Sequence, residues 1–343
     1  MTAIDARDSA RVTRPLPVMD LGPFLRGEPG ALETLAAQWR EVCENLGFFC
    51  IVNHGVPREM VDAMDREVRR FHALPHEEKM QIRVNEHQRG YIPSKATIVK
   101  HSTYEKHTKL DTVECLVLAT DYPENHPESL AGKQFYGQNP WPENVPGFRE
   151  TVAGYMAAIQ DLALKLLPVW SRALELPADF FAPYFKEPYA YIRLAKYPKV
   201  EYVADQEFGL GAHADTGFMT FLPLAAEEGL QVLDEKNQWI WPQVPAGALI
   251  VNTGQFLSRW TNGRFRATPH RVLPPRHNDR YSFACFINTS LDSVAECLPT
   301  CHSAENPPKW PAQSYWSFFE WYMRNTYTHY GSVKADAEEQ AAA

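Results

Sequence analysis

Three side chains in the C-terminal half of the sequence have the types and spacing of a metal site. His213 and Asp215 stand two apart in LGAHADTGFMTFL, residues 210–222. In an extended segment, residues i and i+2 project to one face, so this imidazole and carboxylate would converge on one point. His270, in the β-like run RFRATPHRVL between two turns, is the best-placed third ligand. These three side chains predict a metal ion that the protein binds on one side, with coordination positions open on the other side.

This combination of ligand types is specific to one kind of metal site, although the two-residue spacing of His and Asp is not. Two imidazoles and one carboxylate that leave three coordination positions open are the ligands of non-haem Fe(II) oxygenases. The same two-residue spacing recurs at His277 and Asp279 in PPRHNDR, where prolines and Asn indicate an exposed turn. Context therefore separates the two pairs, because Gly211 and its alanine neighbours leave room around His213.

A second pair of polar residues, Arg280 and Ser282, lies on the run RYSFACF, again two apart and on one face. A guanidinium that faces an apolar barrel costs several kcal/mol unless a carboxylate meets it. The sequence offers no obvious partner. A small dicarboxylate that chelates the metal at one end and pairs with Arg280 at the other would satisfy both sites.

The run YAYIRLAKYP supplies further candidates for the same cavity. Alternate residues share one face of it, namely Tyr189, Tyr191, Arg193, Ala195 and Tyr197. Arg193 and Tyr197 are therefore candidates to reach into the same cavity; a core tyrosine and a surface arginine are the alternative.

The spacing of apolar residues along the chain predicts the helices and strands that position these residues. Helical spacing ends at Gly47 and predicts a helix over 31–46, a strand over 47–53 and a further helix after Pro57. Residues 85–112 are polar and aperiodic, which predicts a binding loop or lid. The apolar stripe of 146–176 predicts a helix that Pro168 kinks or splits.

From Tyr189 onward, short β-like runs separated by turns predict a sandwich or barrel. SYWSFFEWYMRNTY predicts an aromatic amphipathic helix against it. The fold class expected is mainly β with flanking helices.

Composition narrows the class of protein. The chain has 343 residues, 45% of them apolar, and a net charge of −8. These values disfavour a nucleic-acid or membrane-surface binder and favour a small-molecule partner in a cytoplasmic protein. Six cysteines without a CxxC pair are expected to be buried thiols; Cys297, Cys301 and His302 form a weak alternative zinc cluster.

These residues resemble a known family, the Fe(II)/2-oxoglutarate-dependent oxygenases, in the branch that is similar to isopenicillin N synthase. The resemblance covers most of the chain and rests on an ordered set of segments: LPVMDLGPFL, EVCENLGFFCIVNHGVP, FHALPHEEK, RGYIP, KYP, HAD, NGRFRATPHRV and RYSFACF. It implies a double-stranded β-helix (jelly roll) in which His213, Asp215 and His270 hold Fe(II). Arg280 and Ser282 would receive the distal carboxylate of 2-oxoglutarate.

The resemblance also implies the remaining assignments. Tyr197 and Arg193 would contact the cosubstrate, and Tyr91 and Phe286 would contact the substrate, with no catalytic residue beyond the metal ligands. The reaction consumes O2, with ascorbate as an optional reductant, and releases succinate and CO2. It would hydroxylate, desaturate or cyclise a small molecule.

The 85–112 segment is basic and suggests an anionic substrate, because it contains Lys95, Lys100, Lys106 and Lys109. A monomer or weak homo-oligomer is expected.

The domain boundaries expected on this basis are a flexible N-terminus (1–14), an N-terminal region (15–120), a connecting helical block (121–185), the β-helix core (186–295), a C-terminal helix region (296–332) and a disordered tail (333–343).

Two positions depart from the family pattern. Gln255 stands where an acidic residue is common, and Ala195 stands where many plant members carry Asn. They leave open how the metal-side carboxylate of 2-oxoglutarate is held.

Three alternatives stay open at this point. One is an oxygenase of the same fold that uses no 2-oxoglutarate. A zinc hydrolase would use the same ligands, but no well-placed general base accompanies them. A sensor or structural β-barrel would normally close its metal site with four ligands, and only three are evident.

Overall fold

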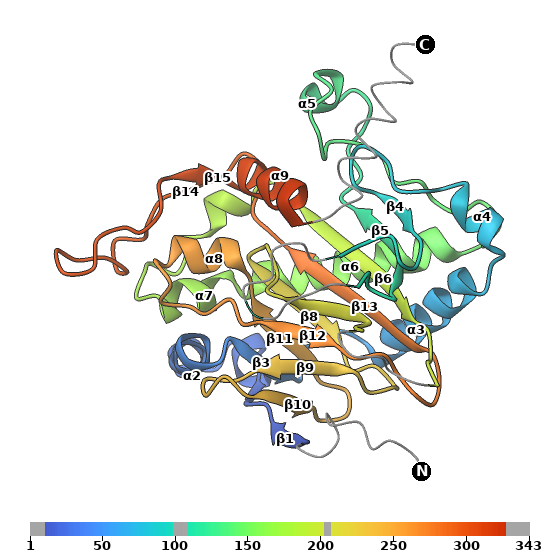
Figure 1. Cartoon of the computed structure of the whole chain (residues 1–343). Coiled ribbons are helices and arrows are strands. Elements are labelled where there is room, and N and C mark those ends of the chain that lie inside the picture. Colours follow the sequence, from blue (N-terminus) through green and yellow to red (C-terminus); the bar gives the residue numbers. More distant parts are fainter. Residues whose placement is uncertain (1–10, 99–103, 105–108, 202–206, 327–343) are drawn as a thin grey trace.

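The centre of the computed structural model, which describes residues 11–98, 104, 109–201 and 207–326, is a pair of β-sheets that face each other (Figure 1). The smaller sheet has the order β1 (Val12–Pro15), β10 (Trp239–Gln243), β9 (Leu230–Leu233), β12 (His270–Val272) and β7 (Leu210–His213). The larger sheet has the order β2 (Val18–Asp20), β3 (Phe48–Val52), β11 (Leu249–Thr253), β8 (Met219–Pro223), β13 (Arg280–Ile287), β6 (Ala190–Tyr197), β5 (Glu114–Ala119) and β4 (Gly90–Ile92). This arrangement is the predicted jelly roll.

Helices flank the sheets. They are α1 (Gly22–Leu25), α2 (Ala31–Asn45), α3 (Arg58–His72), α4 (His76–Met80), α5 (Pro127–Leu130), α6 (Phe148–Lys165), α7 (Leu167–Ala173), α8 (Gln255–Trp260) and α9 (Tyr315–Thr326), with a short 3-10 helix at Ala182–Phe185. Helices α3 and α6 pack against β6 and β13, while α2 packs against α7 and β3. These helices thus support the larger sheet.

The helices and strand predicted in the N-terminal half are confirmed within two residues as α2, β3 and α3. The predicted break at Pro168 is also confirmed, since α6 ends at Lys165 and α7 begins at Leu167. Proline lies in the first turn of α7, where its missing N–H removes no hydrogen bond. The segment Phe148–Ala173 has the length and apolar composition of a membrane span. Burial of α6 in the core accounts for that composition.

The prediction of a polar loop over 85–112 is wrong in part, because the segment contains β4. Its Arg89 is fully buried and donates from Nη2 to the carbonyl of Phe135 over 2.7 Å. A buried guanidinium that donates to carbonyls ties this segment to the chain that follows β5. Lys100 and Lys106 lie outside the described residues.

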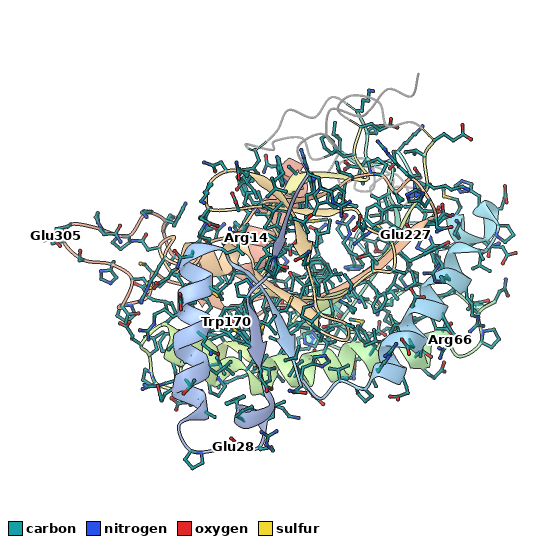
Figure 2. All side chains as sticks on the ribbon, turned by 90° about the horizontal axis from the view of Figure 1, so that it is seen from below. Arg14, Glu28, Arg66, Trp170, Glu227 and Glu305 are labelled. Atoms are coloured by element: carbon teal, nitrogen blue, oxygen red, sulfur yellow. The ribbon has the colours of Figure 1, made fainter. Side chains whose placement is uncertain are left out.

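The expected domain boundaries remain predictions, but the sheet crosses two of them. β5 ends at Ala119, beside the boundary at 120, and pairs with β6, which begins shortly after 186. β3 pairs with β11 in the same sheet. The N-terminal region and the core therefore share one sheet. In the C-terminal region, β14 (Val294–Ala295) and β15 (Gln313–Ser314) pair, and Glu305 lies at the far end of the projecting segment between them (Figures 1 and 2).

A buried charge cluster joins α3 and α4 to the larger sheet. Glu114, on β5, is 7% exposed and accepts from Lys79 Nζ at 2.8 Å, while Lys196 Nζ lies 3.2 Å from its other oxygen. Tyr91 also donates to Glu114. Although burial opposes it, the neighbouring His72, Lys79 and Tyr91 hold the pKa of Glu114 well below its usual range. The cluster fixes the N-terminal helices against β5 and β6.

Replacing Glu114 by Gln is expected to lower the free energy of unfolding by about 3 kcal/mol, because two ammonium groups lose their buried counter-charge. Since the folded pKa is depressed, the stabilisation is present above the unfolded pKa of about 4.3 and is lost as pH falls through the acid range. Urea unfolding from pH 3 to 8 should therefore show a flatter profile for Glu114→Gln. Glu150→Gln, at an exposed position of α6, is the matched control. Equal denaturant midpoints for the two variants would contradict the assignment.

Candidate active site

The three predicted metal ligands meet at one end of the cavity between the sheets. His213 ends β7 and His270 begins β12, and the two residues are direct cross-strand partners. Asp215 follows β7, and its Oδ1 lies 3.8 Å from His213 Nε2 and 3.5 Å from His270 Nε2. The three candidate ligand atoms all lie within 4.8 Å of one another. His213 and Asp215 therefore converge, as their two-residue spacing in an extended segment predicts.

The hydrogen bonds of the two imidazoles select which nitrogen faces the metal position. His213 Nδ1 lies 2.8 Å from the carbonyl of Gly211, and His270 Nδ1 lies 3.2 Å from the carbonyl of Thr268. A carbonyl only accepts, so each Nδ1 carries a proton, and Nε2 presents a lone pair when the ring is neutral. Although burial opposes it, the adjacent Asp215 raises the pKa of His270, so a proton competes with metal at that Nε2. Burial, followed by the charge of His270, lowers the pKa of His213 to about 3. His213 is therefore neutral near pH 7, as a metal ligand must be.

The carboxylate of Asp215 is held by its second oxygen. Oδ2 accepts from Thr220 Oγ1 at 2.6 Å and from Asn252 Nδ2 at 2.7 Å, which leaves Oδ1 directed at the imidazoles. Gln255, at the position that departs from the family pattern, donates from its side chain to the carbonyl of Ala214 at 2.8 Å. Its backbone N–H donates to the carbonyl of Asp215 at 2.7 Å. Gln255 thus holds the backbone of the ligand segment.

Arg280 and Ser282, on β13, line the same cavity. Arg280 is 3% exposed, and among the described residues its Nε and Nη1 have no hydrogen-bond partner. Burial lowers its pKa, and its guanidinium lies 5.0 Å from the ring centroid of Tyr197, its cross-strand neighbour. A Cβ on Gly229 would come within 3.1 Å of Arg280 Cδ, so the chain passes closely beneath it. No carboxylate of the described residues pairs with this guanidinium, and its burial favours binding of an anion.

Alternation along β6 and β13 places the predicted residues on one surface. The five alternate residues of the first run all line the cavity, as do Arg280, Ser282 and Phe286. Of the predicted site residues, Tyr91 alone is elsewhere: it is 1% exposed, and its hydroxyl is committed to Glu114. The prediction that Tyr91 reaches the substrate is therefore not met. Its neighbour Ile92 lines the cavity instead, because adjacent residues of β4 face opposite ways.

Some lining residues were not predicted from the sequence. Thr220 and Asn252 come from β8 and β11, and nothing in their own segments marks them as partners of Asp215. Phe319, Tyr322 and Met323 of α9 cover the cavity. Their i, i+3, i+4 spacing in the predicted aromatic helix was the signal that could have identified this face.

The donor set fits Fe(II) and a dicarboxylate cosubstrate. Two bare imidazole nitrogens and one oriented carboxylate oxygen form an open-sided site, while the buried guanidinium of Arg280 needs an anion. Within the described part of the chain, His213, Asp215 and His270 are the one group that could hold a metal ion. The alternative cluster of Cys297, Cys301 and His302 is not such a group.

Comparison with known proteins agrees with this chemistry. Residues 16–144 match the family profile described as non-haem dioxygenase in morphine synthesis N-terminal, and residues 189–289 match that of the 2OG-Fe(II) oxygenase superfamily. The chain is 33% identical over 335 residues to the 2-oxoglutarate-Fe(II) type oxidoreductase hxnY of Emericella nidulans, with 95% of each chain covered.

Solved structures show the same architecture. A 2OG-Fe(II) oxygenase family protein from Caulobacter crescentus superposes with a TM-score of 0.77 at 28% identity, covering 91% of this chain and 99% of that one. The complex of JOX2 with 2OG, Fe and JA gives a TM-score of 0.71 at 29% identity, covering 90% and 84%.

Proposed function

The chain belongs to the 2OG-Fe(II) oxygenase superfamily, and we propose that it hydroxylates a small, flat, anionic molecule at this site. Membership makes it a non-haem iron, 2-oxoglutarate-dependent dioxygenase that oxidises small molecules. The single observation that carries the finer proposal is the aromatic lining of the cavity beside the metal ligands, with Arg193 in its wall in addition to Arg280.

The roles proposed for the residues follow from their positions. His213, Asp215 and His270 would hold Fe(II), and Arg280 with Ser282 would bind the distal carboxylate of 2-oxoglutarate by charge-assisted hydrogen bonds. When bound, iron and 2-oxoglutarate supply the O2-dependent oxidation and yield succinate and CO2. The chain contributes placement and water exclusion, because apolar walls surround the reacting centre.

The shape of the substrate is inferred from stacked rings. Tyr191 and Phe286 lie with centroids 4.3 Å apart and an interplanar angle of 10°, and Phe319 of α9 lies 5.7 Å from Tyr191. Tyr191 Oη also lies 3.4 Å from Thr216 Oγ1, which fixes its ring. Flat aromatic walls favour a flat ligand, since offset stacking adds about 0.5–1.5 kcal/mol beyond the area buried.

The charge of the substrate is inferred from Arg193. It projects from β6 into the cavity close enough to His213 for its charge to depress the pKa of that imidazole. In a largely apolar cavity, a guanidinium favours a carboxylate or a similar anion. Lys95 and Lys109 of the basic segment are exposed and do not line the cavity, so Arg193 supports the anionic substrate better than they do.

A screen by succinate release tests this proposal. Flat aromatic carboxylates should stimulate 2-oxoglutarate turnover, whereas their neutral carboxamide counterparts should stimulate it weakly. Stimulation by neutral, non-planar molecules alone would contradict the proposed substrate class while leaving the cosubstrate chemistry intact.

Replacing Arg193 by Gln is expected to raise the KM of the stimulating carboxylate roughly tenfold or more, because a charge-assisted hydrogen bond contributes about 1.5–3 kcal/mol. The KM for 2-oxoglutarate in the absence of substrate should change little. Lys95→Gln is the matched control for the exposed basic segment. If Arg193→Gln instead raises the KM for 2-oxoglutarate, Arg193 belongs to the cosubstrate site and the substrate assignment fails.

A further inference from the structure

The strand that carries His213 is an edge strand with incomplete backbone pairing. β7 is the last strand of the smaller sheet, and its pairing with β12 is irregular between the pairs His270–His213 and Val272–Leu210. The chain that leads into β5 hydrogen-bonds to the two residues that precede β7. Thr112 N–H donates to Phe208 and Val113 N–H donates to Gly209, each over 3.1 Å.

Asp111 extends this contact to β7 with its side chain. Its Oδ1 accepts the N–H of Gly211, a residue of β7, at 2.9 Å. The carbonyl of the same Gly211 accepts from His213 Nδ1 at 2.8 Å. A continuous path therefore runs from the Asp111 carboxylate, through both hydrogen-bonding groups of Gly211, to a metal ligand.

The environment of Asp111 disfavours the charged form of its carboxyl group. It is 1% exposed, and within the described residues its Oδ2 has no hydrogen-bond partner. Burial raises the pKa of Asp111 to about 7, against the N–H of Gly211 and the charge of Arg193, which lower it. An asparagine could also accept the N–H of Gly211, by a weaker neutral hydrogen bond and without the desolvation of a charge. A role that profits from a charge-assisted hydrogen bond accounts for the aspartate.

We propose that Asp111 is a positioning residue of the metal site: its carboxylate fixes Gly211, and Gly211 in turn fixes the imidazole of His213. The backbone of Asp111 has a separate function. Its N–H donates to Thr97 and its carbonyl accepts from Lys95, and these bonds hold the preceding segment whatever the side chain is. A side-chain substitution therefore tests the path to His213 without removing them.

Co(II) is a suitable probe, because its visible absorption reports ligand geometry independently of turnover. Asp111→Ala is expected to bind Co(II) roughly tenfold more weakly, the lower end of the loss typical when a residue that orients a metal ligand is removed. Its absorption bands should also shift. Asp111→Asn retains an acceptor but makes a neutral hydrogen bond about half as strong, so its affinity should fall between those of wild type and Asp111→Ala. Asp161→Asn, at an exposed position of α6, should match the wild type.

The thermal unfolding midpoint of each apo variant separates this effect from general destabilisation. A folded Asp111→Ala variant with wild-type Co(II) affinity and spectrum would overturn the proposal. If Asp111→Ala does not fold, Asp111→Asn decides: weaker Co(II) binding with an unchanged Asp161→Asn control supports the proposal, and wild-type binding overturns it. Failure of the wild-type chain to bind Co(II) would overturn both this proposal and the metal site. Failure of the substrate screen alone would leave it standing.

Discussion

Replacing His213 by Ala is expected to abolish 2-oxoglutarate-dependent succinate release and to weaken Fe(II) binding by more than about a hundredfold. The expected loss exceeds the roughly 10- to 100-fold typical of removing a group that only orients a ligand, because here the ligand itself is removed. His270 and Asp215 would remain, and two ligands on one side cannot define an open-sided three-ligand site. Fe(II) affinity by competition with a chelating dye and succinate release measure the two effects.

The sequence provides a matched control for this variant. His277 has the same two-residue relation to Asp279 that His213 has to Asp215, but it is exposed, and Asp279 instead accepts the N–H of Lys199 at 2.9 Å. His277→Ala should therefore retain wild-type Fe(II) affinity and turnover. Equal losses in the two histidine variants, or full activity in His213→Ala, would refute the assignment of the metal ligands.

Replacing Arg280 by Gln is expected to weaken 2-oxoglutarate binding roughly tenfold to over a hundredfold. A charge-assisted hydrogen bond to the distal carboxylate contributes about 1.5–3 kcal/mol, and each 1.4 kcal/mol is about tenfold in affinity. Because Arg280 is 3% exposed, no solvent replaces that hydrogen bond in the variant. Anaerobic titration of the Fe(II)-loaded protein with 2-oxoglutarate gives the dissociation constant directly.

Two comparisons sharpen this experiment. Arg280→Lys keeps the charge but loses the planar fork, so it should bind 2-oxoglutarate with an affinity between those of wild type and Arg280→Gln. Arg66→Gln removes an exposed arginine on the outer side of α3 (Figure 2) and should have no effect. Unchanged 2-oxoglutarate affinity in Arg280→Gln would refute its role.

The parts of the site that depend on period-two alternation were predictable from the sequence. The positions two apart on β6 and β13, and the pair His213 and Asp215, needed only the geometry of an extended strand. His270 was harder, because it meets His213 through cross-strand register, which spacing along the chain does not contain. Its place in a β-like run between two turns made it the best candidate, and the resemblance to a known family implied the same residue.

What escaped prediction depends on tertiary contacts between distant segments. Asn252 reaches Asp215 from β11, and Glu114 draws Tyr91 away from the cavity into a charge cluster. The 85–112 segment was predicted to be a binding loop or lid because it is polar and aperiodic, but Arg89 and Asp111 have their partners inside the fold. Composition reports polarity, whereas burial depends on which partner the fold provides.

The most direct test of the account is the spectrum of the Fe(II)-loaded protein without oxygen. Addition of 2-oxoglutarate should produce a weak visible charge-transfer band, and admission of air should then yield succinate. Neither signal should appear when Zn(II) replaces Fe(II). A spectrum that 2-oxoglutarate leaves unchanged, or activity restored by Zn(II), would contradict an iron site that binds 2-oxoglutarate through Arg280.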